Sequence, residues 1–580
     1  MISKEYKTIG LIVENINTDY TQDLIHSVYN AIPRDENIRV FTFAGKGEEG
    51  VGIFGDKNEY VSIYNSVVFM AGDIDFDGYI IALGSLRSVD KKKLKRFTGM
   101  LKDVPRVYIS ADIGDGVVID YDNESGIREV VDLLVNIGNL SRFAMLGGGE
   151  DNFDAVERRD IFTKCLSQRG ITMPERAHVT SDMSITCYDR AEKLLDDNPD
   201  AEVIFCVNDA VAKPLYDVMK QRGITPGRDV KVFGFDNTRL AAGLEPPLSS
   251  IGTGSMTVGK KALEVLLNLL SGEKAESAKV ATTLYARASM EYDMLSRTLI
   301  DVTRIDRGDL DIIFDMCFYR YKNEIYNREN VNLRRLFNEI MFRIIKAMKN
   351  RCMSEDEYGD ICRLIDILID NGVMEYTDPQ RFVQCINQLQ SAINTAQKSV
   401  AVNVYINRLF LRIKDRMVYI LSGQKEAVVR ENALETERMK EYLMSGFNRM
   451  ETSDDPAEVS IRMLDKLGVD NLLFYMYEKP FIVGADKKPF PQKIDLRCMI
   501  KEGEMYVMAH DRRSGAVSEM FKREEIPSRS MGYVGFPVFC KDHIFGILAC
   551  EPDRNIYGLG ELIAAELGRT LFVNEKQLEV

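Results

Sequence analysis

The feature that most constrains the fold is an alternation, over residues 7–240, of short apolar runs with amphipathic runs. The first run, Thr8–Val13, is apolar throughout, and Asp23–Ile32 follows it with helical spacing. Seven later runs repeat the strand pattern: Arg39–Phe43, Gly78–Leu83, Arg106–Ile109, Val117–Asp120, Arg142–Leu146, Glu202–Val207 and Lys231–Phe235. Continuously apolar strands separated by helices are typical of parallel sheets that helices cover on both faces. In such sheets, ligands bind at the carboxyl ends of the strands.

The pattern changes near residue 298, where strand signals stop and helical patterns such as Leu333–Lys349 begin. Residues 401–450 are consistent with one long helix. Leu421, Val428 and Tyr442 are spaced in sevens, but Glu435 interrupts the seam, so a short coiled coil and an ordinary packed helix both remain open.

The last part of the chain returns to a mixed pattern that predicts an α+β domain. Its expected elements are a helix at Ala457–Leu467, strands at Asn471–Glu478 and Glu504–Ala509, a hairpin of Tyr533–Cys540 with Ile544–Glu551, and a helix at Leu559–Phe572. The sequence therefore predicts four units: a two-lobed α/β domain (1–295), an all-helical domain (296–400), a connector helix (401–452) and an α+β domain (453–580).

Composition and motifs argue against several classes of protein. The net charge of −14 argues against a general nucleic-acid binder, because phosphate binding needs concentrated Lys and Arg. The ten cysteines show no C-x-x-C spacing and the four histidines form no ligand pair, so we expect no metal and no cofactor. Phosphate-loop and G-x-S-x-G signatures are absent, and we expect no enzymatic activity.

The expected location is the cytoplasm. Ten scattered thiols fit a reducing compartment. The N-terminal residues lack the pattern of a signal peptide, and no apolar stretch reaches the ~18 residues of a membrane span.

Several segments in the first 295 residues resemble, in order and spacing, the effector-binding domain of the lac-repressor family. They are Thr8–Asn17, Asp77–Ile81, Asp122-Asn123 with Gly126 and Gly138, Phe143–Gly148, Val207–Ala210, Arg222–Ile224, Asp229–Asn237 and Pro246–Ile251. The resemblance implies a periplasmic-binding-protein-like fold of two lobes with a small-molecule site between them.

Polar residues that follow the predicted strands give the candidate site. Asp236 and Arg158 match the family, and a carboxylate beside a guanidinium could clamp neighbouring hydroxyls or a carbonyl. Tyr20 offers a flat face for a sugar or base ring, or packs in the core. Asn208 and Asp209 either line the site or cap the helix Ala210–Gln221. The predicted ligand-binding set is Thr18, Tyr20, Ser125, Arg158, Asn208, Asp209 and Asp236.

The chain departs from the family pattern in places. Ile161-Phe162 stands where a Gly-aromatic pair is common, Gly252–Ser255 replaces polar or aromatic pocket residues, and Ser125 replaces a carboxylate found in some relatives. These departures leave the identity of the ligand open, and they are also compatible with an empty pocket.

The layout resembles bacterial fusions in which such a sensor, a helical connector and a GAF-like domain precede an output domain, often a diguanylate cyclase. Gly535–Val538 and Phe545–Leu548 carry the GAF-like resemblance. Members of the repressor family begin with a helix-turn-helix, whereas this chain begins at the first strand of the sensor, so we expect no direct contact with nucleic acid. Because no apolar stretch is long enough to span a bilayer, we also expect no contact with a membrane.

The function that these observations predict is a ligand-sensing signalling or transcription-regulator-like protein. We expect a homodimer that binds a sugar or nucleoside and relays lobe closure to an output partner. One alternative is a truncated or split regulator whose output is missing or on another chain. The other is a dimerisation scaffold that binds no ligand.

Overall fold

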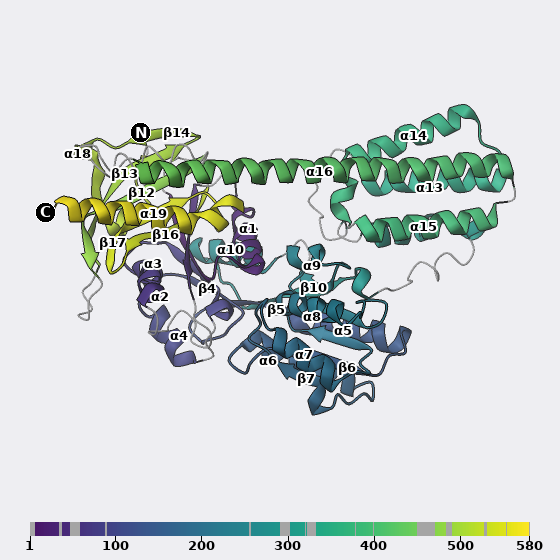
Figure 1. The fold of residues 1–580 in the computed structure, drawn as a ribbon, viewed down its shortest axis with the longest axis horizontal. Helices are drawn as coiled ribbons and strands as arrows, with labels where there is room; N and C mark the ends of the chain where they lie inside the picture. Colours follow the sequence, from purple (N-terminus) through teal and green to yellow (C-terminus); the bar gives the residue numbers. More distant parts are fainter. Residues whose placement is uncertain are drawn as a thin grey trace.

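The computed structural model describes residues 6–578 except 34–36, 47–58, 87–89, 254–256, 291–301, 319–320, 322–331, 378, 398, 449–469, 483–489, 527–530 and 553. Figure 1 shows two α/β lobes, a group of helices beside them, and a C-terminal part that the long helix α16 reaches. None of the helices in these residues is long and apolar enough to cross a membrane.

Lobe 1 is a parallel sheet of order β2–β1–β3–β4–β5. Its strands are β1 (Lys7–Glu14), β2 (Ile38–Gly45), β3 (Gly78–Ile81), β4 (Arg106–Ile109) and β5 (Val117–Asp122). Its helices are α1 (Asp19–Tyr29), α2 (Glu59–Tyr64), α3 (Ser66–Met70), α4 (Lys91–Thr98) and α10 (Val258–Leu270).

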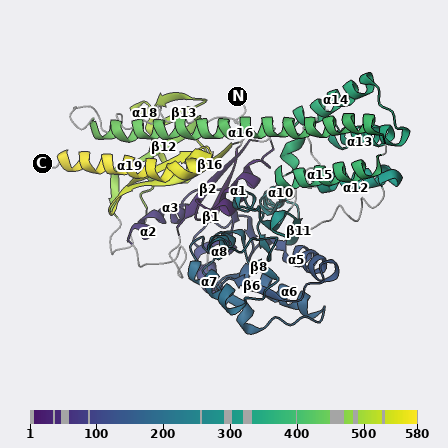
Figure 2. The ribbon, with the colours of Figure 1, turned by 45° about the vertical axis from the view of Figure 1, so that its right-hand side comes forward.

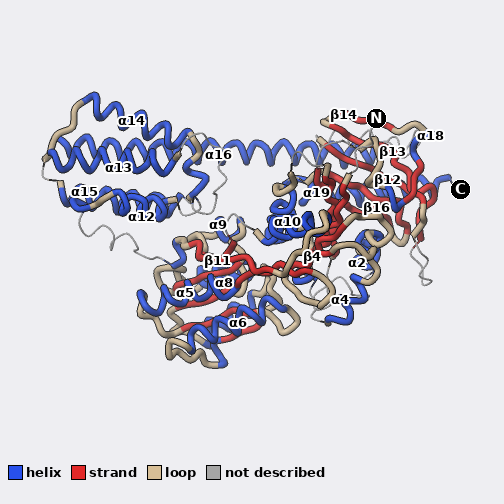
Figure 3. The backbone as a smooth tube through the Cα atoms, turned by 180° about the vertical axis from the view of Figure 1, so that it is seen from behind, coloured by secondary structure: helices blue, strands red, loops and turns tan. Residues whose placement is uncertain are grey.

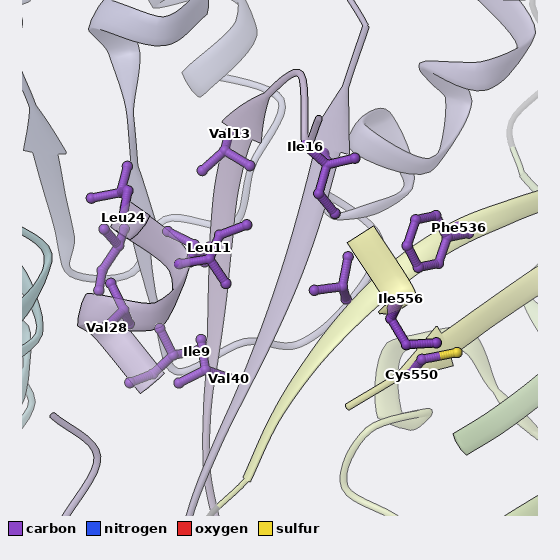
Figure 4. Close-up of a cluster of buried hydrophobic side chains, with 14 of the residues drawn as sticks. Ile9, Leu11, Val13, Ile16, Leu24, Val28, Val40, Phe536, Cys550 and Ile556 are labelled. Atoms are coloured by element: carbon purple, nitrogen blue, oxygen red, sulfur yellow. The ribbon is translucent and has the colours of Figure 1, made fainter. Parts of the chain in front are cut away.

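Strand β1 shows why these strands are apolar throughout. Ile9, Leu11 and Val13 face a core that also contains residues of α1 and α10 (Figure 4). Ile12 faces a second core on the other side of the sheet, together with residues of α3 and α4. Because both faces are buried, apolar side chains occur at both odd and even positions between Ile9 and Val13.

Lobe 2 is a second parallel sheet of order β7–β6–β8–β9–β10. Its strands are β6 (Phe143–Gly147), β7 (His178–Thr180), β8 (Val203–Cys206), β9 (Lys231–Phe235) and β10 (Ser249–Thr253). Its helices are α5 (Asn123–Asp132), α6 (Phe153–Ser167), α7 (Tyr188–Asp197), α8 (Asp209–Gln221) and α9 (Arg239–Gly243). Strand β11 (Ala278–Tyr285) joins the lobes, because its first half pairs with β5 and its second half with β10. The two-lobed parallel architecture expected for this region is therefore present.

The helical part shares one apolar core. It contains α12 (Arg307–Cys317), α13 (Leu333–Asn350), α14 (Glu355–Asp370), α15 (Pro379–Ala396) and the first half of α16 (Val400–Asn448). Figure 2 shows α16 leaving this group and running alongside the C-terminal helix α19 (Arg554–Leu578).

The C-terminal part is an antiparallel sheet in which β13–β12–β17–β16 lie side by side. The strands are β12 (Asn471–Ile482), β13 (Lys493–Lys501), β14 (Glu504–Val507), β15 (Ser514–Ala516), β16 (Met531–Cys540) and β17 (His543–Cys550), with the short helix α18 (His510–Arg513) before β15. The helix expected at Ala457–Leu467 lies outside the described residues.

Lobe 1 and the C-terminal part share a sheet. β16 of the C-terminal part pairs in parallel with β2 of lobe 1, so one sheet continues across both parts (strands are red in Figure 3). The fully buried guanidinium of Arg39 on β2 donates hydrogen bonds to the carbonyl oxygens of Phe521 (2.9 Å), Arg523 (3.2 Å) and Ile526 (3.1 Å). The hydroxyl of Tyr29 donates to the carbonyl of Tyr533 at 2.7 Å. The two parts are therefore joined through backbone pairing as well as side chains.

Candidate functional site

Arg158 and Asp236 meet at the carboxyl ends of the lobe 2 strands. Arg158 lies on α6 and its Nη2 is 3.0 Å from Oδ1 of Asp236, which follows β9. The guanidinium also donates to the carbonyl of Val207 (2.9 Å) and to Oδ1 of Asn123 (3.3 Å), and its carbon lies 3.7 Å from the centre of the Phe235 ring. This buried cation is thus held by an anion, two neutral acceptors and an aromatic face.

Tyr20 of α1 faces this pair from lobe 1. The hydroxyl of Tyr121, at the end of β5, donates to the Tyr20 hydroxyl at 3.3 Å. Burial raises the pKa of Tyr20, and the carboxylates of Asp154 and Asp236 raise it further because they disfavour a phenolate. Tyr20, Arg158 and Asp236 therefore lie close enough to influence one another electrostatically, and their contact with a ligand remains a prediction.

Asp154 is a second carboxyl group near Arg158. It lies in the first turn of α6, where a Cβ built on Gly84 of lobe 1 would be 3.2 Å from its Oδ2. Burial is the main cause that raises its pKa to about 7; Arg158 opposes this rise, and the neighbouring carboxylates add to it. At neutral pH this group therefore lies near its titration point, unlike an ordinary aspartate.

The lobes touch each other on either side of these residues. Asp19 of α1 accepts a hydrogen bond from the backbone N–H of Leu240 at 2.9 Å, and Arg239 donates to Gln22 at 2.6 Å. Phe153 of lobe 2 packs against the apolar core on the face of the lobe 1 sheet that carries Ile12. Helix α1 of lobe 1 is therefore in direct contact with lobe 2.

Two other candidates have capping roles. Asn208 caps α8, with its side chain accepting from the N–H of Val211 at 3.2 Å, which is the alternative that the sequence left open. Thr18 caps α1 in the same way through the N–H of Thr21, also at 3.2 Å.

Asp209 and Ser125 are engaged inside the protein. Asp209 is buried and accepts hydrogen bonds from the Ser250 hydroxyl (2.6 Å) and from the N–H (2.7 Å) and hydroxyl (3.0 Å) of Thr238, so it does not cap α8. Ser125 donates to the carbonyl of Thr282 at 2.9 Å and thereby ties α5 to β11. Their contact with a ligand remains a prediction.

Three residues that lie near Tyr20 or Arg158 in the structure were not predicted from the sequence: Asp154, Tyr121 and Asn123. Asn123 is fully buried, and its amide donates to Glu157 at 2.6 Å while its oxygen accepts from Arg158. The signal that could have found Asp154 is Asn152, a good cap residue that starts α6 directly after a predicted strand and its loop. In the described part of the chain, no group of three or more His, Cys, Asp or Glu residues could hold a metal ion.

Asp154 predicts a pH dependence of stability. Its pKa is about 7 in the folded protein and ~3.9 in an unfolded chain, so the folded state holds the proton more tightly. Stability contributed by this group is complete below pH ~4 and is lost as pH rises towards 7. Between pH 5 and 8, the melting temperature of the wild type should therefore fall more than that of Asp154→Asn, which cannot ionise. Equal slopes in the two proteins would contradict this assignment.

Comparisons with known proteins agree with this architecture. A family described as periplasmic binding protein-like domain matches residues 131–290. The chain is 25% identical over 276 residues to the HTH-type transcriptional repressor PurR of Vibrio atlanticus, covering 47% of this chain and 76% of that protein. It is 27% identical over 196 residues to the HTH-type transcriptional regulator CelR of Thermobifida fusca, covering 32% and 56%.

Solved structures similar to the chain include a complex of the transcriptional regulator CelR with cellobiose (21% identity, TM-score 0.40, 49% of this chain and 86% of that chain). Another is the lac repressor dimer bound to operator and the anti-inducer ONPF (18% identity, TM-score 0.41, 50% and 96%). The fold described above and the sequence matches lead to one conclusion. Residues 131–290 carry a periplasmic binding protein-like domain, and about half of the chain is similar in sequence to HTH-type transcriptional regulators.

Proposed function

We propose that the chain senses a small polar metabolite of the sugar or nucleoside class, which binds between the two lobes. The observation that carries this proposal is the buried Arg158–Asp236 pair, 3.0 Å apart, which lies near Tyr20 of the other lobe. A guanidinium donates and a carboxylate accepts, so together they match adjacent hydroxyl groups, and the tyrosine ring offers a face for a sugar or base ring.

Closure of the lobes is the proposed signal. A ligand favours the closed arrangement only to the extent that it binds this form more tightly than an open one. Lobe 1 is tied to the C-terminal part through β2 and β16, so lobe 2 is the part expected to move. We infer that this movement reaches α16, and through it a partner that carries the output. We also take the C-terminal part to be GAF-like, on the strength of Gly535–Val538 and Phe545–Leu548.

A thermal-shift screen of the full chain against sugars, nucleosides and small acids tests the proposal. A ligand present at ~100 times its dissociation constant adds ~2.7 kcal/mol to the free energy of unfolding, which corresponds to several degrees. We expect at least one compound to stabilise the wild type and to have no effect on Asp236→Asn. This variant keeps the side-chain volume and an oxygen for Arg158, but it loses the charge.

Asp229→Asn is the matched control, because Asp229 is a surface carboxylate of the same lobe that pairs with Arg228. It should respond to the ligand as the wild type does. If Asp236→Asn responded equally well, the ligand would bind elsewhere. Silence of the folded wild type towards every compound would favour a scaffold that binds no ligand.

A further inference from the structure

Helix α16 has two apolar faces, and only one of them is covered by the helical part. The covered face carries Val402, Ile406, Leu409, Phe410, Ile413 and Met417 in the shared core. The opposite face exposes Val400, Val404, Leu411, Val418 and Tyr419, whose exposed fractions lie between 47% and 83%. The outer face of a packed helix is normally polar, so a row of apolar side chains there indicates an unfilled interface.

The exposed residues have the spacing of a coiled-coil seam. Val404, Leu411 and Val418 are seven residues apart and occupy a positions, and Val400 precedes Val404 by four, which is the distance from a d to an a position. The d positions between them are Asn407 and Lys414, which are hydrogen-bonded to Gln390 of α15, so the apolar seam from Val404 to Val418 consists of the a positions. The seam from Val400 to Val418 is ~27 Å long at 1.5 Å per residue. It is also symmetric, because Val404 and Val418 lie at equal distances before and after Leu411.

Two charged residues flank this seam with opposite signs. Arg408 and Asp415 both lie at e positions, on either side of Leu411, and both are exposed. Neither forms an ion pair within the described residues. The neighbouring arginines of α16 are instead already paired with α14: Arg412 with Asp366, and Arg416 with Asp370. Arg408 and Asp415 are therefore the charges that this face leaves for another molecule.

These charges fit a second copy of the same helix in one orientation. When two such helices run antiparallel about Leu411, Arg408 of each copy faces Asp415 of the other, and Val404 faces Val418. In a parallel pair, e positions face g positions, and here the g positions are Phe410 and Met417, which are buried in their own helical part. We propose that two copies of the chain associate through this face of α16 as an antiparallel pair centred on Leu411.

Sedimentation of the full chain over a range of concentrations tests the surface. A charge at the centre of the seam, Leu411→Glu, should weaken the dimer at least ~30-fold, because buried central contacts carry most of the binding free energy. Ile185→Glu in lobe 2 is the control, since its side chain is 55% exposed compared with 56% for Leu411. A wild type that stays monomeric, or a Leu411→Glu variant that dimerises normally, would overturn the proposal.

A charge exchange tests the orientation. Arg408→Glu and Asp415→Arg should each weaken the dimer, because each brings like charges together, and the double variant should restore it. Oxidation of Leu411→Cys in a Cys352→Ser background should join two copies covalently, whereas Val404→Cys should not, because its antiparallel partner is Val418. Efficient crosslinking through Val404→Cys, or a double variant as weak as the single variants, would rule out the antiparallel pair.

Discussion

Arg39→Ala is expected to lower the free energy of unfolding of the unit formed by lobe 1 and the C-terminal part by about 3–5 kcal/mol. The guanidinium is fully buried and donates to three carbonyl groups of the segment that precedes β16. Its loss leaves those acceptors without donors and opens a cavity between the two parts. Arg39→Lys should also be costly, because an ammonium group lacks the planar fork that reaches several acceptors.

Calorimetry or urea unfolding of the full chain measures this effect, which corresponds to a fall in melting temperature of about 10 °C. Arg142→Ala is the control, because Arg142 is an exposed arginine whose ion pairs with Asp200 and Glu202 lie on the surface. That change should cost under ~1 kcal/mol. Equal losses in the two variants would mean that the β2–β16 junction adds little to stability.

Arg158→Met is the second change with a large expected effect. Removing the guanidinium leaves the Asp236 carboxylate, the carbonyl of Val207 and the Asn123 side chain without their donor, at a cost of about 3–5 kcal/mol. Arg158 is also what lowers the pKa values of Asp154 and Asp236 against the effect of burial. Both pKa values should therefore rise further in the variant.

The sign of the pH effect follows from those pKa values. A carboxyl group whose pKa is higher in the folded state than in the unfolded chain stabilises the folded state while it is protonated. This contribution to the free energy of unfolding is lost as pH rises towards the folded-state pKa. The difference in stability between wild type and Arg158→Met should therefore be larger at pH 8 than at pH 5. Arg159→Met, on the adjacent residue with surface partners Glu150 and Asp160, should show a small difference at both pH values. A gap that shrank with rising pH would contradict the assigned role of Arg158.

The sequence predicted the strands that are continuously apolar and missed those that are short or polar. β4 was predicted at the residues where it occurs, and β1 to within one residue at each end. β7 has only three residues, β10 begins with Ser249 and Ser250, and β11 alternates between buried and exposed positions. The two serines are buried because their hydroxyl groups are hydrogen-bonded, which apolar patterning does not reveal.

The candidate site was predictable only in part. A residue that follows a strand is expected at the carboxyl edge of the sheet, but this position does not indicate which residues its side chain will bind. The family resemblance selected Arg158 and Asp236, which form an ion pair, whereas the position after a strand also selected Asp209, whose carboxylate is hydrogen-bonded inside lobe 2. Asp154 lies close to Gly84 of the other lobe, and that proximity has no local signature in the sequence. Arg39 has none either, since its carbonyl acceptors lie more than 480 residues away in sequence.

The pairing of β2 with β16 has a consequence for how the chain is made. The ribosome releases β2 early, but about 490 residues must follow before β16 can cover its edge. At ~5–20 residues per second, that edge stays open for ~25–100 s. An uncovered strand edge invites pairing with other chains, so newly made molecules should depend on chaperones until their C-termini emerge. A chain cut short by a premature stop before β16 would keep this edge open and would stay exposed to pairing with other chains.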